Sequence, residues 1–387
     1  MKRRFKWEYM KAIFNRYHKA SKAIKRIILD EFCKVCGYHR KHAIRKLNES
    51  PSEEKSKGQR CKRQPIYGPI VISILQKVWE AADYPWSSRL KEILRLWMPW
   101  IRKHFRLTPE QEQQLLRISP RTIDYRLKTR KTQLRRRIYG QTKPGTLLKH
   151  HIPIKTDNWN VTVPGFTEID LVSHSGNSAD GVFIHSLNQT DILTTWTEAR
   201  AVMGKGQIGV SKALDEMRQE SPFDWLGIDS DNGSEFINAH LYRYCQMPPK
   251  LQFTRGRPYK KDDNAHVEQK NWTHVRKLLG YERYDSDLAL QAINDLYRNE
   301  LRLMKNLFQP SVKLIKKIRV GSRLIRKYDN PQTPLDRLIA SKKGNLARVA
   351  MFKRLREVID PFELAGVIES KLDGIYKLAN RRLSPKA

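Results

Sequence analysis

Between residues 159 and 284, short β-branched runs alternate with helix-like segments, and this alternation limits the folds open to the region. Three strand-like runs come first, and a helix, a strand, a helix, a strand and a long helix follow. This order is typical of a layered α/β domain, in which helices cover the faces of a sheet. We therefore predict a mixed sheet flanked by helices over residues 159–284.

The individual segments of this domain follow from composition and period. Strands are expected where β-branched and aromatic residues cluster, and helices where apolar residues recur at helical spacing. A turn is expected at residues 188–191, between the second and third strands. The expected strands are 166–172, 181–187, 192–202 and 225–229, and the expected helices are 206–218, 236–246 and 264–279.

The charge of the chain is strongly positive and unevenly distributed. Lysine and arginine total 75 against 40 aspartate and glutamate residues, a formal net charge of +35. Residues 1–50 contain 15 basic and 4 acidic residues, whereas residues 161–240 contain 4 basic and 12 acidic residues. Such a charge repels itself unless a polyanion binds, and nucleic acid is the usual polyanion. The asymmetry predicts one part that holds phosphates and another that gathers carboxylates around a hard cation.

Two segments upstream of the α/β region have the pattern of a helix-turn-helix. The first covers about residues 21–47, with a break at Cys36-Gly37-Tyr38, and the second covers about residues 115–134, where Ser119 is a good N-cap. Ile123 and Leu127 are expected to face inward, and basic side chains are expected on the outer faces, as in helices that lie in a DNA groove. The expected DNA contacts on these helices are Arg40, Lys41, Arg45, Arg121 and Arg126.

These patterns divide the chain into six parts. The N-terminal and second helical regions are expected to be all-α DNA-binding domains, and polar or basic linkers follow each of them. The C-terminal part is a basic extension with helices and short strands. The expected boundaries are 1–50, linker 51–65, 66–140, basic linker 141–158, α/β core 159–284 and C-terminal region 285–387.

Three acidic residues of the core stand where a metal site is expected. Asp170 lies inside an apolar strand, Asp231 ends a strand before Asn-Gly, and Glu268 lies on an amphipathic helix. Phosphodiester transfer needs charge neutralisation on the attacking and leaving oxygens, which two divalent ions supply. Carboxylates are the ligands that Mg²⁺ or Mn²⁺ prefers. Asp229, two residues before Asp231, is a rival for its place.

The sequence around these residues resembles the retroviral-integrase-like DDE transposases of bacterial insertion sequences, which share the RNase H-like fold. The resemblance covers about residues 159–284, and 36 residues separate Asp231 from Glu268, close to the usual spacing of that family. It implies that Asp170 bridges two Mg²⁺ or Mn²⁺ ions, that Asp231 binds metal, and that Glu268 completes the ligands of the second ion. It also implies water attack at transposon ends, followed by attack of the freed 3′-hydroxyl on target DNA, without ATP. The matching segments are Glu168-Ile169-Asp170, Ser230-Asp231-Asn232-Gly233-Ser234-Glu235-Phe236 and residues 256–271.

Several other residues permit a functional and a structural interpretation. Lys260, Lys261 and Lys270 are expected to contact phosphates near the metals, and a solvated helix face is the alternative for Lys270, His274, Arg276 and Lys277. His174 is expected in a surface loop, Trp272 in the core, and Asp191 and Glu198 in structural or surface positions. The spacing of Cys33, Cys36, His39 and His42 lacks the long excursion of a zinc finger, so these cysteines are expected to be reduced core residues.

The sequence therefore predicts a soluble, cytoplasmic bacterial enzyme that cuts transposon ends and joins them to target double-stranded DNA. A homodimer or larger assembly is expected, because strand transfer needs two ends held together. No apolar run approaches the length of a membrane span. Two alternatives stay open: a catalytically inactive DNA-binding regulator derived from a transposase, and a nuclease that acts on RNA. The deep groove of RNA excludes a reading helix, which favours duplex DNA.

Overall fold

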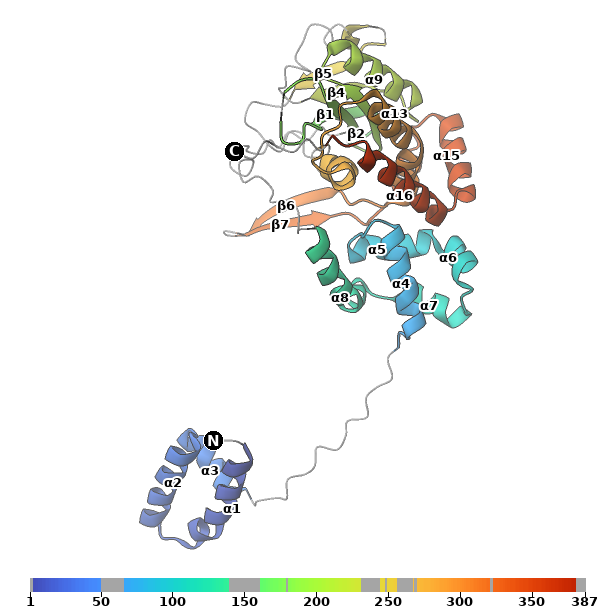
Figure 1. The fold of residues 1–387 in the computed structure, drawn as a ribbon. Helices are drawn as coiled ribbons and strands as arrows, with labels where there is room; N and C mark the ends of the chain where they lie inside the picture. The colour runs from blue at the N-terminus through green and yellow to red at the C-terminus, as the bar shows by residue number, and fades with distance from the viewer. Residues whose placement is uncertain are drawn as a thin grey trace. The chain divides into compact units, whose positions relative to one another are not determined.

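Contacts divide the chain into two compact units, Met1–Pro65 and Ile66–Ala387, each with its own apolar core (Figure 1). The computed structural model describes residues 3–49, 66–138, 161–178, 180–230, 244–247, 249–255, 267, 270–320 and 323–380.

The described residues of the first unit form three helices around a small core. α2 ends at Gly37, whose φ of +64° is a left-handed conformation that glycine adopts without steric cost. A short turn then leads into α3, so that two helices joined by a turn occupy the segment 21–47. Phe32, Cys36 and Leu47 meet in the core. The helices are α1 (Arg3–Lys19), α2 (Lys22–Cys36) and α3 (Arg40–Asn48).

The second unit begins with five helices. The last of them starts as its sequence predicts, because the Thr122 amide donates to Ser119 Oγ at 3.1 Å and Pro120 is its first residue. Ile123 and Leu127 are buried, as expected. The five are α4 (Pro69–Ala81), α5 (Ser87–Leu96), α6 (Met98–Phe105), α7 (Pro109–Arg117) and α8 (Pro120–Ile138).

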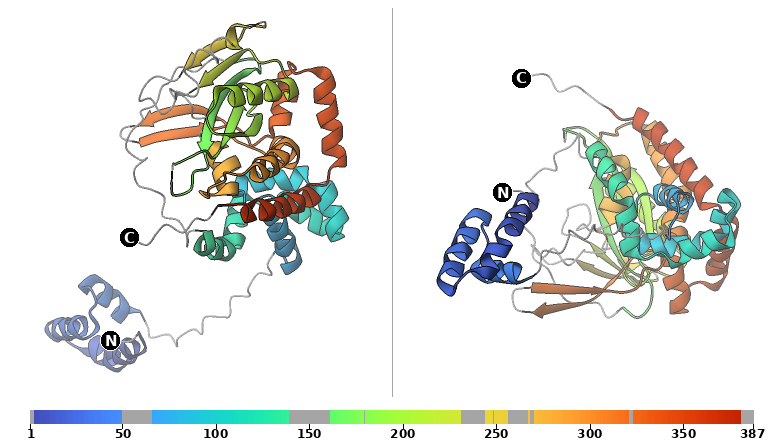
Figure 2. Two further views of the ribbon diagram at one scale, coloured as in Figure 1. Left: turned by 45° about the horizontal axis from the view of Figure 1, so that its top comes forward. Right: turned by 90° about the horizontal axis from the view of Figure 1, so that it is seen from below.

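A five-stranded mixed sheet forms the centre of the second unit. Its strand order is β3-β2-β1-β4-β5, with β1, β2 and β3 antiparallel and β4 and β5 parallel to β1. The α9 helix (Gln207–Glu220) and the α13 helix (Asp287–Leu296) both pack against β3 (Figure 2). The predicted mixed sheet with flanking helices is thus confirmed. The strands are β1 (Phe166–Ser173), β2 (Ile184–Asp191), β3 (Thr197–Met203), β4 (Gly227–Ser230) and β5 (Gln252–Arg255).

The turn expected at residues 188–191 was wrong, because β2 continues to Asp191 and the chain reverses over residues 192–196. Asp191 explains the position of the reversal. One of its carboxylate oxygens accepts from the Thr194 amide at 2.7 Å and from the Thr194 hydroxyl at 2.6 Å, and the other accepts from the Gly165 amide at 2.7 Å. Tertiary partners thus hold polar residues inside a strand. Of the helix expected at 236–246, only residues 244–246 are described, and they are helical.

Residues after the sheet close the second unit. Among the described residues of this part, three π-helical turns interrupt the helices, and two antiparallel strands form a separate hairpin. None of the described helices is long and apolar enough to cross a membrane. The elements are η2 (Asn271–Arg276), α12 (Lys277–Leu279), η3 (Tyr297–Leu301), η4 (Met304–Phe308), β6 (Leu314–Val320), β7 (Arg323–Tyr328), α14 (Pro334–Ser341), α15 (Leu346–Val358) and α16 (Pro361–Lys377).

The helices α4 to α8 belong to the same compact unit as the sheet. The Trp97 indole donates to the Phe308 carbonyl at 3.2 Å, and the Gln309 amide donates to the Ala82 carbonyl at 3.1 Å. These contacts join the expected second helical region to the segment that follows the sheet, so the two do not form separate compact bodies.

Glu198 on β3 is structural, one of the two alternatives open from the sequence. It is 1% exposed and accepts from Arg302 at 2.8 Å, while its neighbour Arg200 donates to Glu220 at 2.7 Å. A buried charge is tolerated when it is paired in this way.

Replacing Asp191 by alanine should destabilise the second unit by about 3 kcal/mol, because three buried donors lose their acceptor. The free energy of unfolding, measured by denaturant titration, checks this. The control is Asp373→Ala on the exposed side of α16, which should change stability by less than about 0.5 kcal/mol. Equal effects of the two variants would contradict a specific role of Asp191 in the turn.

Candidate active site

The central strand β1 carries the first candidate metal ligand, Asp170. This residue lies opposite Asn188 of β2 in the antiparallel ladder and is half-buried. One carboxylate oxygen accepts from the Leu171 amide at 2.7 Å, and the other accepts from the side-chain amide of Asn271 in η2. Asp170 is therefore oriented by its own strand and by a segment that is distant in sequence.

The segment that contains Asn271 crosses the face of β1 on which Asp170 lies. Glu168 is two residues before Asp170, so its side chain is on the same face of the strand. Glu168 is 3% exposed, and its carboxylate accepts from the Val267 amide at 2.9 Å. Val267 and Asn271 thus hold the chain on either side of residue 268 close to β1.

The pairing of β1 with β4 places a further acidic residue, Asp229 of β4, beside β1. Glu168 pairs with Asp229 and Ile169 pairs with Ser230 in a parallel register. Asp229 is 7% exposed and accepts from the Thr254 hydroxyl of β5 at 2.8 Å. The other two expected ligands, Asp231 and Glu268, lie outside the described residues.

The oxygen atoms around Asp170 fit a hard cation. The Asn188 side-chain amide donates to Asn271 Oδ1 at 2.7 Å, and Asn188 Oδ1 is buried without a hydrogen-bond partner among the described residues. A buried carbonyl oxygen without a donor is costly, and a cation would satisfy it. Carboxylate and amide oxygens are the metal ligands that Mg²⁺ prefers.

Two basic residues that flank Asn271 in sequence, Lys270 and His274, are buried. Lys270 is 8% exposed, and burial, reinforced by the charges of Arg89, Lys305 and Arg337, lowers its pKa to about 7. Burial lowers the pKa of His274 well below its ordinary value, with the Lys270 charge as the second cause. Neither residue lies on a solvated helix face, so that alternative was wrong for both of them. The burial of Lys270 also removes it from the exposed cations that could contact phosphates.

The expected DNA contacts differ in their accessibility. Lys41, Arg45 and Arg121 are exposed, whereas Arg126 is half-buried. Arg40 is exposed but forms an ion pair with Asp30 of α2. Lys260 and Lys261 lie outside the described residues.

Two expectations near the site were wrong. Trp272 is 53% exposed and not part of the core. The π-helical geometry of η2 turns His274 and Val275 inward instead. His174 is fully buried and not in a surface loop, because its ring bonds Ser186 Oγ at 2.7 Å and lies edge-on to Tyr284.

Sequence reasoning missed Asn271, which holds Asp170 in place. Its spacing was a usable signal, since it follows Glu268 by three residues and residues three apart share a helix face. Asn188 gave no such signal, because it was assigned to a turn.

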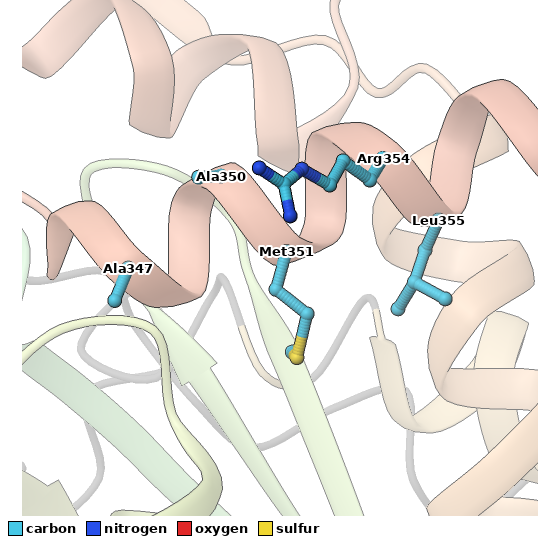
Figure 3. Close-up of a pocket in the computed structure, with 5 residues that line it drawn as sticks. All are labelled: Ala347, Ala350, Met351, Arg354 and Leu355. Atoms are coloured by element: carbon cyan, nitrogen blue, oxygen red, sulfur yellow. The ribbon is translucent and has the colours of Figure 1, made fainter.

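Two other features of the described residues are weaker candidates. His104, Asp360 and Glu363 bring ligand atoms within 4.8 Å of one another, and Cys33, Cys36, His39 and His42 form no such group. Asp360 already accepts from the Phe362 amide at 3.0 Å, and Lys103 lies 3.6 Å from its other oxygen, which supplies the balancing charge. A hollow along α15 is lined by apolar side chains and one arginine (Figure 3). It offers no carboxylate. Its lining residues are Ala347, Ala350, Met351, Arg354 and Leu355.

The sequence matches no known family profile. It is 39% identical over 333 residues to the "Uncharacterized protein y4rM" of Sinorhizobium fredii. The aligned region covers 85% of this chain and 94% of that protein. The chain belongs to the y4rM family. The solved catalytic core domain of BIV integrase is similar to 46% of this chain over 95% of its own length, at 15% identity and a TM-score of 0.30. A TM-score of 0.30 is too low to assign a fold or a function to this y4rM family member.

The buried His174 should make folding of this y4rM family member sensitive to acid. Burial lowers its pKa to about 3, whereas the unfolded chain takes up this proton near pH 6.5. The stability that neutral His174 contributes is therefore complete above about pH 6.5 and is lost as the pH falls towards about 3. His174→Gln should flatten this dependence by up to about 1.4 kcal/mol per pH unit.

Denaturant unfolding of both proteins at several pH values between about 4 and 7 measures the two slopes. The comparison isolates His174, because His274 is common to both proteins. Parallel curves for the wild type and the variant would contradict the assignment.

Proposed function

We propose that this chain is a DDE-type DNA transposase, a metal-dependent enzyme that cuts transposon ends and transfers the freed strand into target duplex DNA. One observation carries the proposal. The described neighbours of all three expected ligands converge on β1: Ile169 pairs with Ser230, and Glu168 binds Val267. Asp170, Asp231 and Glu268 are the next residues in sequence after Ile169, Ser230 and Val267.

Chain connectivity makes this convergence informative. Consecutive Cα atoms are about 3.8 Å apart, so each candidate ligand is tied to a described neighbour by one peptide unit. An RNase H-like core accounts for the mixed sheet and for a helix segment that crosses its central strand. The proposed catalytic set is Asp170, Asp231 and Glu268.

Two Mg²⁺ or Mn²⁺ ions held by these carboxylates would supply charge neutralisation on the attacking and leaving oxygens. The residues of the chain itself provide preorganisation. Asn271 and the Leu171 amide fix the two oxygens of Asp170, and Asn188 holds Asn271. Such support matters because displacement by about 1 Å costs roughly 10²-fold in rate.

The two helical parts are proposed to hold the DNA. Lys41 and Arg45 on α3 and Arg121 on α8 are exposed cations at the positions of a groove-reading or backbone-contacting helix. The proposal includes a homodimer or larger assembly, because two ends must be joined together.

Replacing Asp170 by asparagine should lower strand cleavage and strand transfer by roughly a thousandfold or more, because a neutral amide is a poor metal ligand. Duplex binding in EDTA should be unchanged. Cleavage of labelled transposon-end DNA and a filter-binding assay measure the two properties.

Two further variants complete this experiment. Asp180→Asn, at an exposed position, should retain full activity, and Asp229→Asn tests the rival ligand. Joint loss of cleavage and binding in Asp170→Asn would contradict the metal role. Unchanged cleavage in that variant would contradict Asp170 as a metal ligand, and absence of cleavage by the wild-type protein would favour the inactive DNA-binding regulator.

Removing the support of Asp170 should give a smaller effect. Asn271→Ala should lower the rate about 10–100-fold and raise the Mg²⁺ concentration needed for half-maximal rate, as is typical when a group that orients a metal ligand is lost. Titration of cleavage against Mg²⁺ measures both changes. The control is Trp272→Phe at the exposed neighbouring position. A rate loss that no Mg²⁺ concentration modifies, with the control equally affected, would refute a positioning role.

A further inference from the structure

The β6–β7 hairpin is the most basic structural element of the second unit that the function above leaves unexplained. Residues 314–328 contain six lysine and arginine residues and no acidic residue. Figures 1 and 2 show the two strands reaching outward as a ribbon that is separate from the central sheet.

The register of the hairpin places basic positions of the two strands opposite each other. Lys316 pairs with Lys327, and Lys317 pairs with Arg326. An isolated two-stranded hairpin is only marginally stable, and a local excess of positive charge favours the binding of a polyanion. The composition of the hairpin therefore points to a negatively charged partner.

The base of the hairpin is nevertheless firmly attached to the unit. The Asp329 carboxylate accepts from the Lys313 amide at 2.6 Å and pairs with Arg337, which also donates to the Ser311 carbonyl at 2.9 Å. The Lys313 ammonium donates to the Leu193 carbonyl at 2.7 Å, in the reversal between β2 and β3. The ribbon thus has a fixed origin on the sheet that carries Asp170.

Most of the described side chains of the ribbon face solvent, and Ile318 is half-buried. Arg319, Arg326 and Lys327 are exposed, and so are the apolar side chains of Ile315 and Ile325, at 69% and 46%. The cations can contact the phosphates of a nucleic acid, and the exposed apolar side chains can contact its base edges.

We propose that this hairpin is a DNA-binding ribbon that docks in a groove of duplex DNA, with Arg319, Arg326 and Lys327 as phosphate contacts. The major groove, about 12 Å wide, admits a two-stranded β-ribbon. The choice of duplex DNA rests on the proposed function, and the excess of cations without acidic residues favours it over a protein partner.

The test is equilibrium binding of the full chain to a random-sequence duplex in EDTA, over a series of KCl concentrations. The variant is Arg319→Gln/Arg326→Gln/Lys327→Gln. Each lost phosphate contact lowers the slope of log affinity against log salt by about 0.9, so the slope should fall by about 2–3 and the Kd should rise at least about tenfold. The single variant Lys327→Gln should show a slope change of about 0.9.

The matched control removes three exposed cations elsewhere on the same unit, by Lys343→Gln/Lys353→Gln/Arg354→Gln. It should leave the slope within about 0.5 of the wild type. Equal changes in both triple variants would overturn the proposal, because a general charge effect would then suffice. An equal loss on single-stranded DNA would overturn docking in a groove.

A lower oligomeric state of the hairpin variant with unchanged duplex binding would also overturn the proposal, in favour of a second copy of the chain. EDTA makes the assay independent of the carboxylates. Inactivity of the enzyme would therefore leave this result standing, and failure here would leave the proposed chemistry intact. Thermal unfolding of each variant verifies that it is folded.

Discussion

The second unit depends on acidic residues placed side by side in the middle of its sheet. Glu168 and Asp229 face each other across the β1–β4 ladder and are almost fully buried. Two buried carboxylates in such a position repel each other and lose hydration, so hydrogen bonds and nearby positive charge must offset the cost. Val267 and Thr254 supply the hydrogen bonds. The bond between Val267 and Glu168 also attaches the segment that contains Asn271 to β1. The hydrogen bond that stabilises a buried carboxylate therefore helps to assemble the candidate site.

Sequence patterns located the parts of this fold that local interactions determine. β1 and α8 lie where expected, because strand composition and the Ser119–Pro120 cap act over a few residues. The end of β2 was misplaced, since polar Asn188 is stabilised inside the strand by Asn271, 83 residues away. His174 was misplaced for the same reason, because its hydrogen bond to Ser186 stabilises it in a buried position. Tertiary partners of polar residues leave no local pattern in the sequence, so these positions could not be predicted from it. Asp231 and Glu268 remain predictions that rest on their sequence context.

The net charge of the chain overstates what is available to DNA. Lys270 and Lys305 are buried, and burial lowers the pKa of the first to about 7 and of the second to about 8. Arg200 is also buried among glutamates. Exposed cations of the described residues include Lys41 and Arg45 on α3, Arg121 on α8, and Arg319, Arg326 and Lys327 on the ribbon. Accessibility, and not composition, therefore decides which basic residues can meet phosphates.

The π-helical turn η2 has a consequence for how this chain can vary. A π-helical turn closes with one more residue than an α-helical turn, and here that extra residue lies between the anchor at Val267 and the buried pair Leu278 and Leu279. Removing one residue would rotate everything before it by about 100° relative to α12. Asn271 would then point away from Asp170. Relatives that preserve this chemistry should therefore tolerate substitutions in the segment but neither insertions nor deletions.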